Sequence, residues 1–147
     1  MTSRLGTVVV TLALVCLVAP VVDAGERERT FRNSDVDGPT AFDFDGFVTF
    51  GGTLVPAASV GRFVADGHGN LTDGERTLMV GGAAVLSQHF TCTYTVRSNG
   101  MGTATCTIEE GGTHETFDFV IVERKKEAYF TSTTPGTVLR GRTKRQQ

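Results

Sequence analysis

From residue 41 onward the chain alternates apolar and polar side chains with a period of two, which is the pattern of half-buried β-strands. The first such segment places Phe42, Phe44 and Phe50 on one face and Asp43 on the other. Similar segments recur along the chain, separated by short stretches rich in glycine, asparagine and charged residues. The pattern predicts about eight strands and no amphipathic helix of useful length.

Short turns between consecutive strands favour antiparallel pairing of neighbours along the chain. The predicted fold is therefore all-β, an antiparallel up-and-down meander of about eight strands closed into a small barrel, which leaves no exposed strand edge. Gly46 predicts a bend or bulge in the first strand. A β-sandwich is the alternative fold, although a Greek key needs at least one long connection between strands.

The N-terminal residues have the regions of a secretory signal peptide. Arg4 supplies a positive charge, residues 5–22 are mainly apolar, and Ala24 ends a short exit segment of small residues. The apolar run is roughly long enough to span a bilayer, so a retained anchor is the alternative. Pro20 and the small exit residues favour cleavage. We predict a cleaved signal peptide at 1–24, export to the periplasm or the extracellular space, and no stable membrane insertion after cleavage.

Cleavage leaves roughly 120 residues, enough for one domain with a modest core. Residues 25–40 are predicted to be a flexible N-terminal segment, because their charges alternate without an apolar face and turn-forming residues follow. The β-barrel domain is predicted over residues 41–143. Residues 144–147 are predicted to be a basic, polar tail.

Two strands on either side of Asn99 predict a disulfide and a strand register together. Removal of Cys16 with the signal peptide leaves two cysteines, which in an exported chain most simply form one disulfide. Folding the chain at Asn99 brings Cys92 opposite Cys106 on the apolar face, where opposed Cβ atoms lie roughly 4.5–5.5 Å apart. The same register predicts two further pairs, Phe90 with Ile108 and Tyr94 with Ala104.

Charge and histidine placement exclude several classes of function. The net charge is −2, whereas nucleic-acid-binding domains usually carry a strong basic surplus, so no nucleic-acid partner is expected. The acidic residues between positions 35 and 45 do not match the spacing of a calcium loop. His68, His89 and His114 fall at a hairpin tip, a strand start and a loop. We therefore expect no metal site and no cofactor.

Three segments of the chain resemble small exported bacterial proteins that carry an allene-oxide-cyclase-like, or calycin-like, β-barrel. They are the glycine–aspartate hairpin at 63–70, residues 94–96 before the cysteine-bearing return strand, and the ending at 134–141. The resemblance implies a closed barrel. It transfers no catalytic residue to this chain, because no active-site motif of the family is matched, and most proteins of this group have no assigned activity.

The predicted inner face of the barrel is rich in aromatic side chains. Barrels of about eight strands stand between those filled by their own side chains and those that hold a ligand. We therefore predict a non-catalytic binding module whose partner is a small apolar molecule, with a filled lumen as the alternative. The ligand-facing candidates are Phe42, Phe44, Phe50, Phe90, Tyr94, Phe117 and Phe119.

Two further functions stay open at this stage, as does the oligomeric state. A structural or interaction protein of the cell envelope or extracellular space would expose an apolar patch, for which Phe47 is the candidate. An isomerase-like or cyclase-like enzyme follows from analogy of fold alone, and it needs an inward-facing carboxylate or histidine. Glu109, Glu110 and Asp118 are the carboxylates to inspect. The sequence favours a protein that is not an enzyme, because no G-x-S-x-G nucleophile motif is present.

Overall fold

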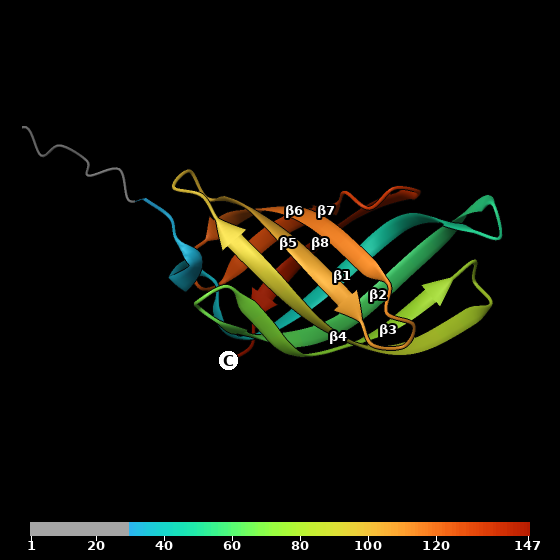
Figure 1. Ribbon diagram of the computed structural model, residues 1–147, viewed down its shortest axis with the longest axis horizontal. Helices are drawn as coiled ribbons and strands as arrows, with labels where there is room; N and C mark the ends of the chain where they lie inside the picture. Colours follow the sequence, from blue (N-terminus) through green and yellow to red (C-terminus); the bar gives the residue numbers. More distant parts are fainter. Residues whose placement is uncertain (1–29) are drawn as a thin grey trace, which may run out of the picture.

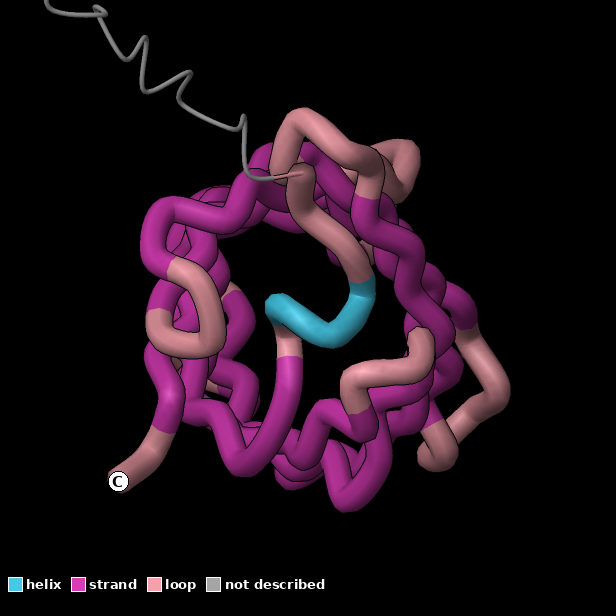
Figure 2. The backbone as a smooth tube through the Cα atoms, turned by 90° about the vertical axis from the view of Figure 1, so that its left-hand side faces the viewer, coloured by secondary structure: helices cyan, strands magenta, loops and turns pink. Residues whose placement is uncertain are grey.

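A computed structural model describes residues 30–147, and the predicted signal peptide at 1–24 lies outside the described residues. Eight antiparallel strands pair in chain order and close into one barrel, which confirms the predicted all-β up-and-down meander (Figures 1 and 2). The last strand pairs with the first, so the β-sandwich alternative is wrong. The strands are β1 Asp37–Phe50, β2 Thr53–Asp66, β3 Asn70–Val80, β4 Ala84–Val96, β5 Met101–Ile108, β6 His114–Glu123, β7 Glu127–Ser132 and β8 Thr137–Arg145.

The hairpin of β1 and β2 is long, and only two residues separate its strands, since β1 ends at Phe50 and β2 begins at Thr53. Gly51 and Gly52 form the turn with φ angles of 58° and 80°, and this pair of positive φ values is typical of a tight two-residue hairpin turn. The hairpin therefore projects past the body of the barrel (Figure 1).

The segment before the barrel differs from the predicted flexible segment at 25–40. From residue 30 on, it contacts one end of the barrel, and a 3-10 helix, η1 (Asn33–Asp35), lies across that end (Figure 2). Strand β1 already begins at Asp37. The Asn33 side-chain oxygen accepts a hydrogen bond from the Val96 backbone N–H at 2.8 Å. The segment consists mainly of turn-forming polar residues, so its sequence does not indicate these distant contacts.

The C-terminal boundary also differs from the prediction. Strand β8 continues to Arg145, which pairs with Thr40 of β1, while Lys144 pairs with Ala41. The predicted tail at 144–147 therefore supplies two residues to the seam that closes the barrel. The domain accordingly spans at least 37–145 rather than 41–143.

Aromatic rings in the barrel interior lie over glycines of a neighbouring strand. A Cβ atom at Gly61 would lie 2.6 Å from the Phe42 ring, and one at Gly102 would lie still closer to the Phe119 ring. The strand glycines thus make room for rings that fill much of the interior. The four pairs are Phe42 with Gly61, Phe90 with Gly74, Phe119 with Gly102 and Phe130 with Gly141.

Gly46 serves close packing rather than the predicted bulge. Strand β1 keeps an unbroken register with both β2 and β8 through this residue. Its φ of 149° and the nearby Val138 carbonyl leave no room for a side chain. The register shifts occur instead in the β2–β3, β3–β4 and β6–β7 ladders.

Candidate functional site

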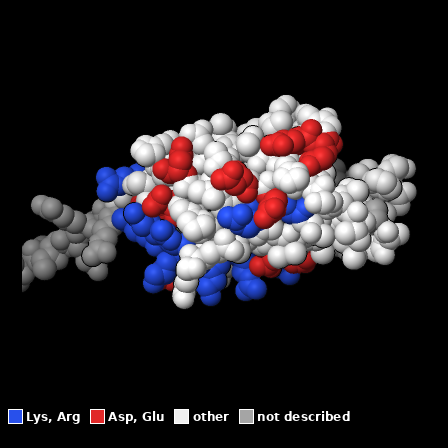
Figure 3. Space-filling model, turned by 90° about the horizontal axis from the view of Figure 1, so that it is seen from below, with Lys and Arg blue, Asp and Glu red and all other residues white. Residues whose placement is uncertain are grey.

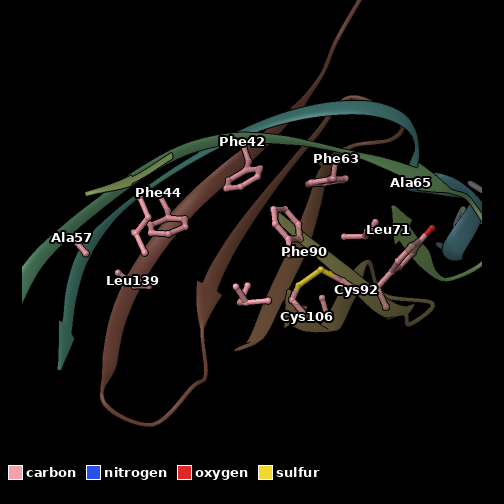
Figure 4. Close-up of a cluster of buried hydrophobic side chains, with 14 of the residues drawn as sticks. Phe42, Phe44, Ala57, Phe63, Ala65, Leu71, Phe90, Cys92, Cys106 and Leu139 are labelled. Atoms are coloured by element: carbon pink, nitrogen blue, oxygen red, sulfur yellow. A yellow bond between two sulfur atoms is a disulfide. The ribbon is translucent and has the colours of Figure 1, made fainter. Parts of the chain in front are cut away.

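The predicted disulfide and its register are confirmed. Cys92 and Cys106 are bonded across β4 and β5, with their Cα atoms 4.0 Å apart. Both predicted neighbouring pairs, Phe90 with Ile108 and Tyr94 with Ala104, are present in the ladder. Both cysteine side chains are buried and face the interior of the barrel (Figure 4).

The barrel interior holds a cavity of about 100 Å³ between these strands. Its wall is almost entirely apolar, and the rings on it pack against one another. The Phe42 and Phe90 centroids lie 5.8 Å apart in an edge-to-face arrangement (Figure 4), and those of Phe117 and Phe130 lie 5.6 Å apart. Six of the seven predicted lumen residues line the cavity: Phe42, Phe44, Phe90, Tyr94, Phe117 and Phe119.

The seventh predicted lumen residue, Phe50, does not line the cavity. Its side chain is 62% exposed. Alternation along β1 places Phe50 on the same face as Phe42 and Phe44. Phe50 adjoins the β1–β2 turn, beyond the point where other strands enclose the interior (Figure 1). The alternation pattern indicates which face of the strand a side chain takes, but not its position along the barrel axis.

One ion pair crosses the cavity from β3 to β6. The Arg76 guanidinium donates from Nη1 and Nη2 to the two carboxylate oxygens of Glu115, each at 2.7 Å. Arg76 Nε donates to the side-chain oxygen of Gln88 at 2.8 Å. The Arg76 side chain is 4% exposed and that of Glu115 is 25% exposed. The pair therefore stands between the apolar cavity and solvent, with its opposite charges matched in a bidentate arrangement.

Sequence reasoning missed this ion pair, although strand alternation contained a signal for it. Arg76 lies on the inward face of β3, at the alternate positions that Leu78 and Val80 also occupy. Glu115 lies two residues before Phe117, on the inward face of β6. Extending each alternation by one step would have placed both charges in the lumen.

The three carboxylates selected from the sequence do not line the cavity. Glu109 and Glu110 are exposed in the turn after β5. Asp118 is half-buried, and it alternates with the cavity-lining Phe117 and Phe119 on β6. Among the described residues that line the cavity, Glu115 is the one carboxylate, and both its oxygens accept hydrogen bonds from arginine.

The end of the cavity under η1 is closed by hydrogen bonds. Val36, directly after the 3-10 helix, lines the cavity, and its carbonyl accepts a hydrogen bond from the Tyr94 hydroxyl at 2.7 Å. Burial, with a smaller contribution from the charge of Asp66, raises the pKa of Tyr94 to about 12. The Asn33 side chain also donates to the His68 carbonyl at 3.3 Å. Tyr94 and η1 together close this end of the apolar interior with polar groups.

The histidines lie apart from the cavity. His89 contacts Glu110 at 2.8 Å on the surface, and this hydrogen bond raises the pKa of His89 and lowers that of Glu110. His68 belongs to the β2–β3 turn, where the Asn70 side chain and nearby backbone N–H groups lower the pKa of Asp66. Within residues 30–147, no group of three or more histidine, cysteine, aspartate or glutamate side chains is arranged to hold a metal ion.

No protein-family model matches the chain, and neither a curated protein nor a solved structure matches it. In the described part of the chain, no helix is long and apolar enough to cross a membrane. The cavity and its ion pair are therefore the observations on which a function can be based.

Proposed function

We propose that the protein is an exported, non-catalytic binding module whose barrel holds one small, uncharged and mainly apolar molecule. The observation that carries this proposal is the apolar cavity, whose wall combines aromatic rings with a single neutralised ion pair, Arg76 with Glu115. Sites for small ligands commonly pair an apolar wall with a few placed polar groups.

The size of the cavity limits the ligand. A volume of about 100 Å³ is below that of an engineered protein cavity of roughly 150 Å³ that binds benzene. Pockets for drug-sized ligands are larger, roughly 300–1,000 Å³. A six-membered ring is therefore the upper limit for the ligand, and a ring of that size enters with a change of rotamer in the surrounding phenylalanines.

The ion pair limits the charge of the ligand. Glu115 already neutralises Arg76, so an anionic ligand would have to displace Glu115 and leave its carboxylate unpaired, which is costly at a partly buried position. Arginine has five N–H groups, and three of those on Arg76 bond to Glu115 and Gln88. The remaining two can donate to a hydroxyl or carbonyl oxygen of a neutral ligand.

Export belongs to the same proposal. The disulfide between Cys92 and Cys106 is suited to an oxidising compartment outside the cytosol. The signal-peptide pattern at 1–24 supports the same location. The resemblance to calycin-like barrels remains a prediction, and a barrel fold alone indicates no function.

The isomerase-like alternative has less support than binding. An acid–base enzyme needs a carboxylate that can exchange a proton with its substrate. Glu115 lines the cavity, but each of its oxygens accepts a hydrogen bond from Arg76. The binding proposal needs no proton transfer.

Ligand binding can be tested by filling the cavity. Ala104 is buried on the cavity wall, so Ala104→Leu would occupy the space that a ligand needs. Ala58 is exposed on the outer face of β2, so Ala58→Leu is the matched control. We expect cyclohexanone to cause saturable amide shift changes at cavity residues in the parent and in A58L, and none in A104L. Equal responses in all three proteins, or no response in any, would overturn the proposal.

A further inference from the structure

Two hairpins at the end of the barrel opposite η1 carry no charged residue. Residues 46–61 form the tip of the β1–β2 hairpin, and residues 77–88 form that of the β3–β4 hairpin. We call these two segments the hairpin tips. Both project past the rest of the barrel (Figure 1), and this end is free of charged side chains in the view of Figure 3. Their composition contrasts with the mixed charges elsewhere on the surface.

The outer face of the hairpin tips is apolar. Phe47 is 47% exposed, Leu54 56%, Met79 45% and Val85 62%. Met79 and Val85 are direct cross-strand partners. Phe47 pairs with Val138 of β8, which is 67% exposed and extends the same surface. These side chains make a connected apolar surface across five strands, of the kind that marks an interaction site.

The inner face of the hairpin tips is apolar and is exposed at two positions. Phe50 continues the inward-facing positions of β1 and is 62% exposed. Leu86 pairs with the core residue Leu78 and is 41% exposed. The inward-facing Ala57, Leu78 and Val80 of the same tips are buried. The tips therefore expose apolar side chains on both faces of the sheet.

Three of the four glycines in the turns of the tips face open space. A Cβ atom added at Gly51, Gly52 or Gly82 would meet no atom within 4 Å, whereas the Gly81 N–H donates to the Pro56 carbonyl at 2.8 Å. The hairpin ladders continue to the turns, with Phe50 paired to Thr53 and Val80 to Ala84. Pairing of this kind satisfies backbone N–H and C=O groups, as an apolar surrounding requires.

Charged residues begin directly behind the tips. Asp45 on β1 pairs across the sheet with Arg140 of β8, and Arg62 of β2 lies 3.6 Å from Glu75 of β3. We call these four residues the charged collar. The five residues of β1 after Asp45 extend roughly 17 Å along the strand at about 3.3 Å per residue. That reach exceeds the roughly 5–10 Å to which interfacial segments enter a membrane.

We propose that the hairpin tips insert into the interfacial region of a lipid bilayer, with the charged collar at the level of the headgroups. Lipid surrounds a projecting element on all sides, which matches apolar side chains on both faces. A second copy packed against the outer face would leave Phe50 and Leu86 exposed. This contact is peripheral and reversible, so it does not require the stable insertion that the sequence argues against. It is independent of the ligand cavity.

Vesicle flotation with single substitutions tests both faces separately. The protein is purified from a host that exports it, its N-terminus is read by mass spectrometry, and phosphatidylcholine vesicles are the probe. Phe50→Asp changes the inner face and Leu54→Asp the outer face. Val122→Asp is the control, because Val122 is 53% exposed on β6, away from the tips. We expect F50D and L54D each to lower the partition coefficient about tenfold, and V122D to leave it unchanged.

A tryptophan probe tests the position of the tip, since the chain has no tryptophan of its own. Phe50→Trp should show a blue-shifted emission on adding vesicles and quenching by brominated lipid. Tyr129→Trp, at a side chain that is 51% exposed on β7, should show neither. Equal quenching at both positions would overturn the proposal.

Three other outcomes would also overturn it. The first is absence of flotation. The second is flotation that needs anionic lipid and disappears at high salt, since that result would assign the contact to basic residues. The third is an oligomer in solution that L54D dissociates and F50D does not, with no flotation, because that result would assign the outer face to a second copy. Replacing Arg76 by Met and Glu115 by Leu together leaves vesicle binding unchanged, so failure here is separate from failure of the ligand proposal.

Discussion

One end of the barrel is closed by η1 and by hydrogen bonds to polar side chains, whereas the other carries projecting hairpins with exposed apolar side chains (Figures 1 and 2). Asn33 and Tyr94 satisfy backbone groups at the closed end. At the other end the Arg76–Glu115 ion pair lines the cavity, and Leu78 and Val80, which follow Arg76 toward the tip of β3, are buried. One end of the cavity is therefore held by hydrogen bonds to backbone groups, and the other by an ion pair and apolar packing.

The largest expected effect comes from breaking the ion pair. Glu115→Ala leaves the Arg76 guanidinium, 4% exposed, without its carboxylate. Removing one partner of a buried pair typically costs about 3–5 kcal/mol, and we expect the low end because Glu115 is 25% exposed. The free energy of unfolding in urea measures this cost.

The control for that experiment is the double variant R76M/E115L, which replaces both charges by apolar groups. Such replacements are often neutral, so we expect its stability to lie within about 1 kcal/mol of the parent. An E115A variant as stable as the parent would show that the ion pair does not hold this end of the cavity.

A smaller effect is expected at the closed end. Asn33→Ala removes the acceptor for the Val96 N–H, which lies 2.8 Å away. Leaving such a donor unsatisfied costs about 1–3 kcal/mol. Amide hydrogen exchange should accelerate at Val96, whose N–H loses its acceptor.

Asn99→Ala is the control, because the Asn99 side chain accepts a hydrogen bond from Met101 N–H in an exposed turn. We expect it to leave exchange at Val96 unchanged. If N33A and N99A behave alike, η1 is not the lid of the barrel.

The smallest effect is a pH dependence at the closed end. The pKa of Tyr94 is raised from 10.0 to about 12, so the folded state favours the protonated phenol. Above pH 10 the unfolded chain loses that proton first, so the stability contribution is complete below pH 10 and is lost as the pH rises toward 12.

The second tyrosine can be removed to isolate this titration. In a Tyr129→Phe variant, absorbance of the phenolate should rise with a midpoint near 12, and only in the folded protein. A midpoint near 10 in the folded protein would show that η1 does not shield Tyr94 from solvent.

Alternation of side chains was sufficient to predict which face each core residue takes. It gave the barrel, the register of Cys92 with Cys106, and six cavity-lining residues. It could not give height along the barrel, because a period of two is the same at the rim and in the middle. For that reason Phe50 was assigned to the lumen although it is exposed.

The pairing of distant polar side chains was beyond the reach of the sequence pattern. Alternation can place Arg76 and Glu115 on inward faces, but it cannot bring together two residues that are 39 positions apart, and charged side chains at inward positions normally argue against burial. The η1 segment reads as a loop because its partners, such as Val96, lie 63 residues away. Each of these contacts depends on closure of the barrel, which brings distant strands together.

Ligand binding in the apolar cavity is tested most directly by nuclear Overhauser effects between bound cyclohexanone and the protein. We expect effects to the methyl groups of Ala104 and Ile108, both of which line the cavity, and their loss in A104L. Effects confined to exposed methyl groups, or effects that persist in A104L, would show instead that the lumen is filled by its own phenylalanines.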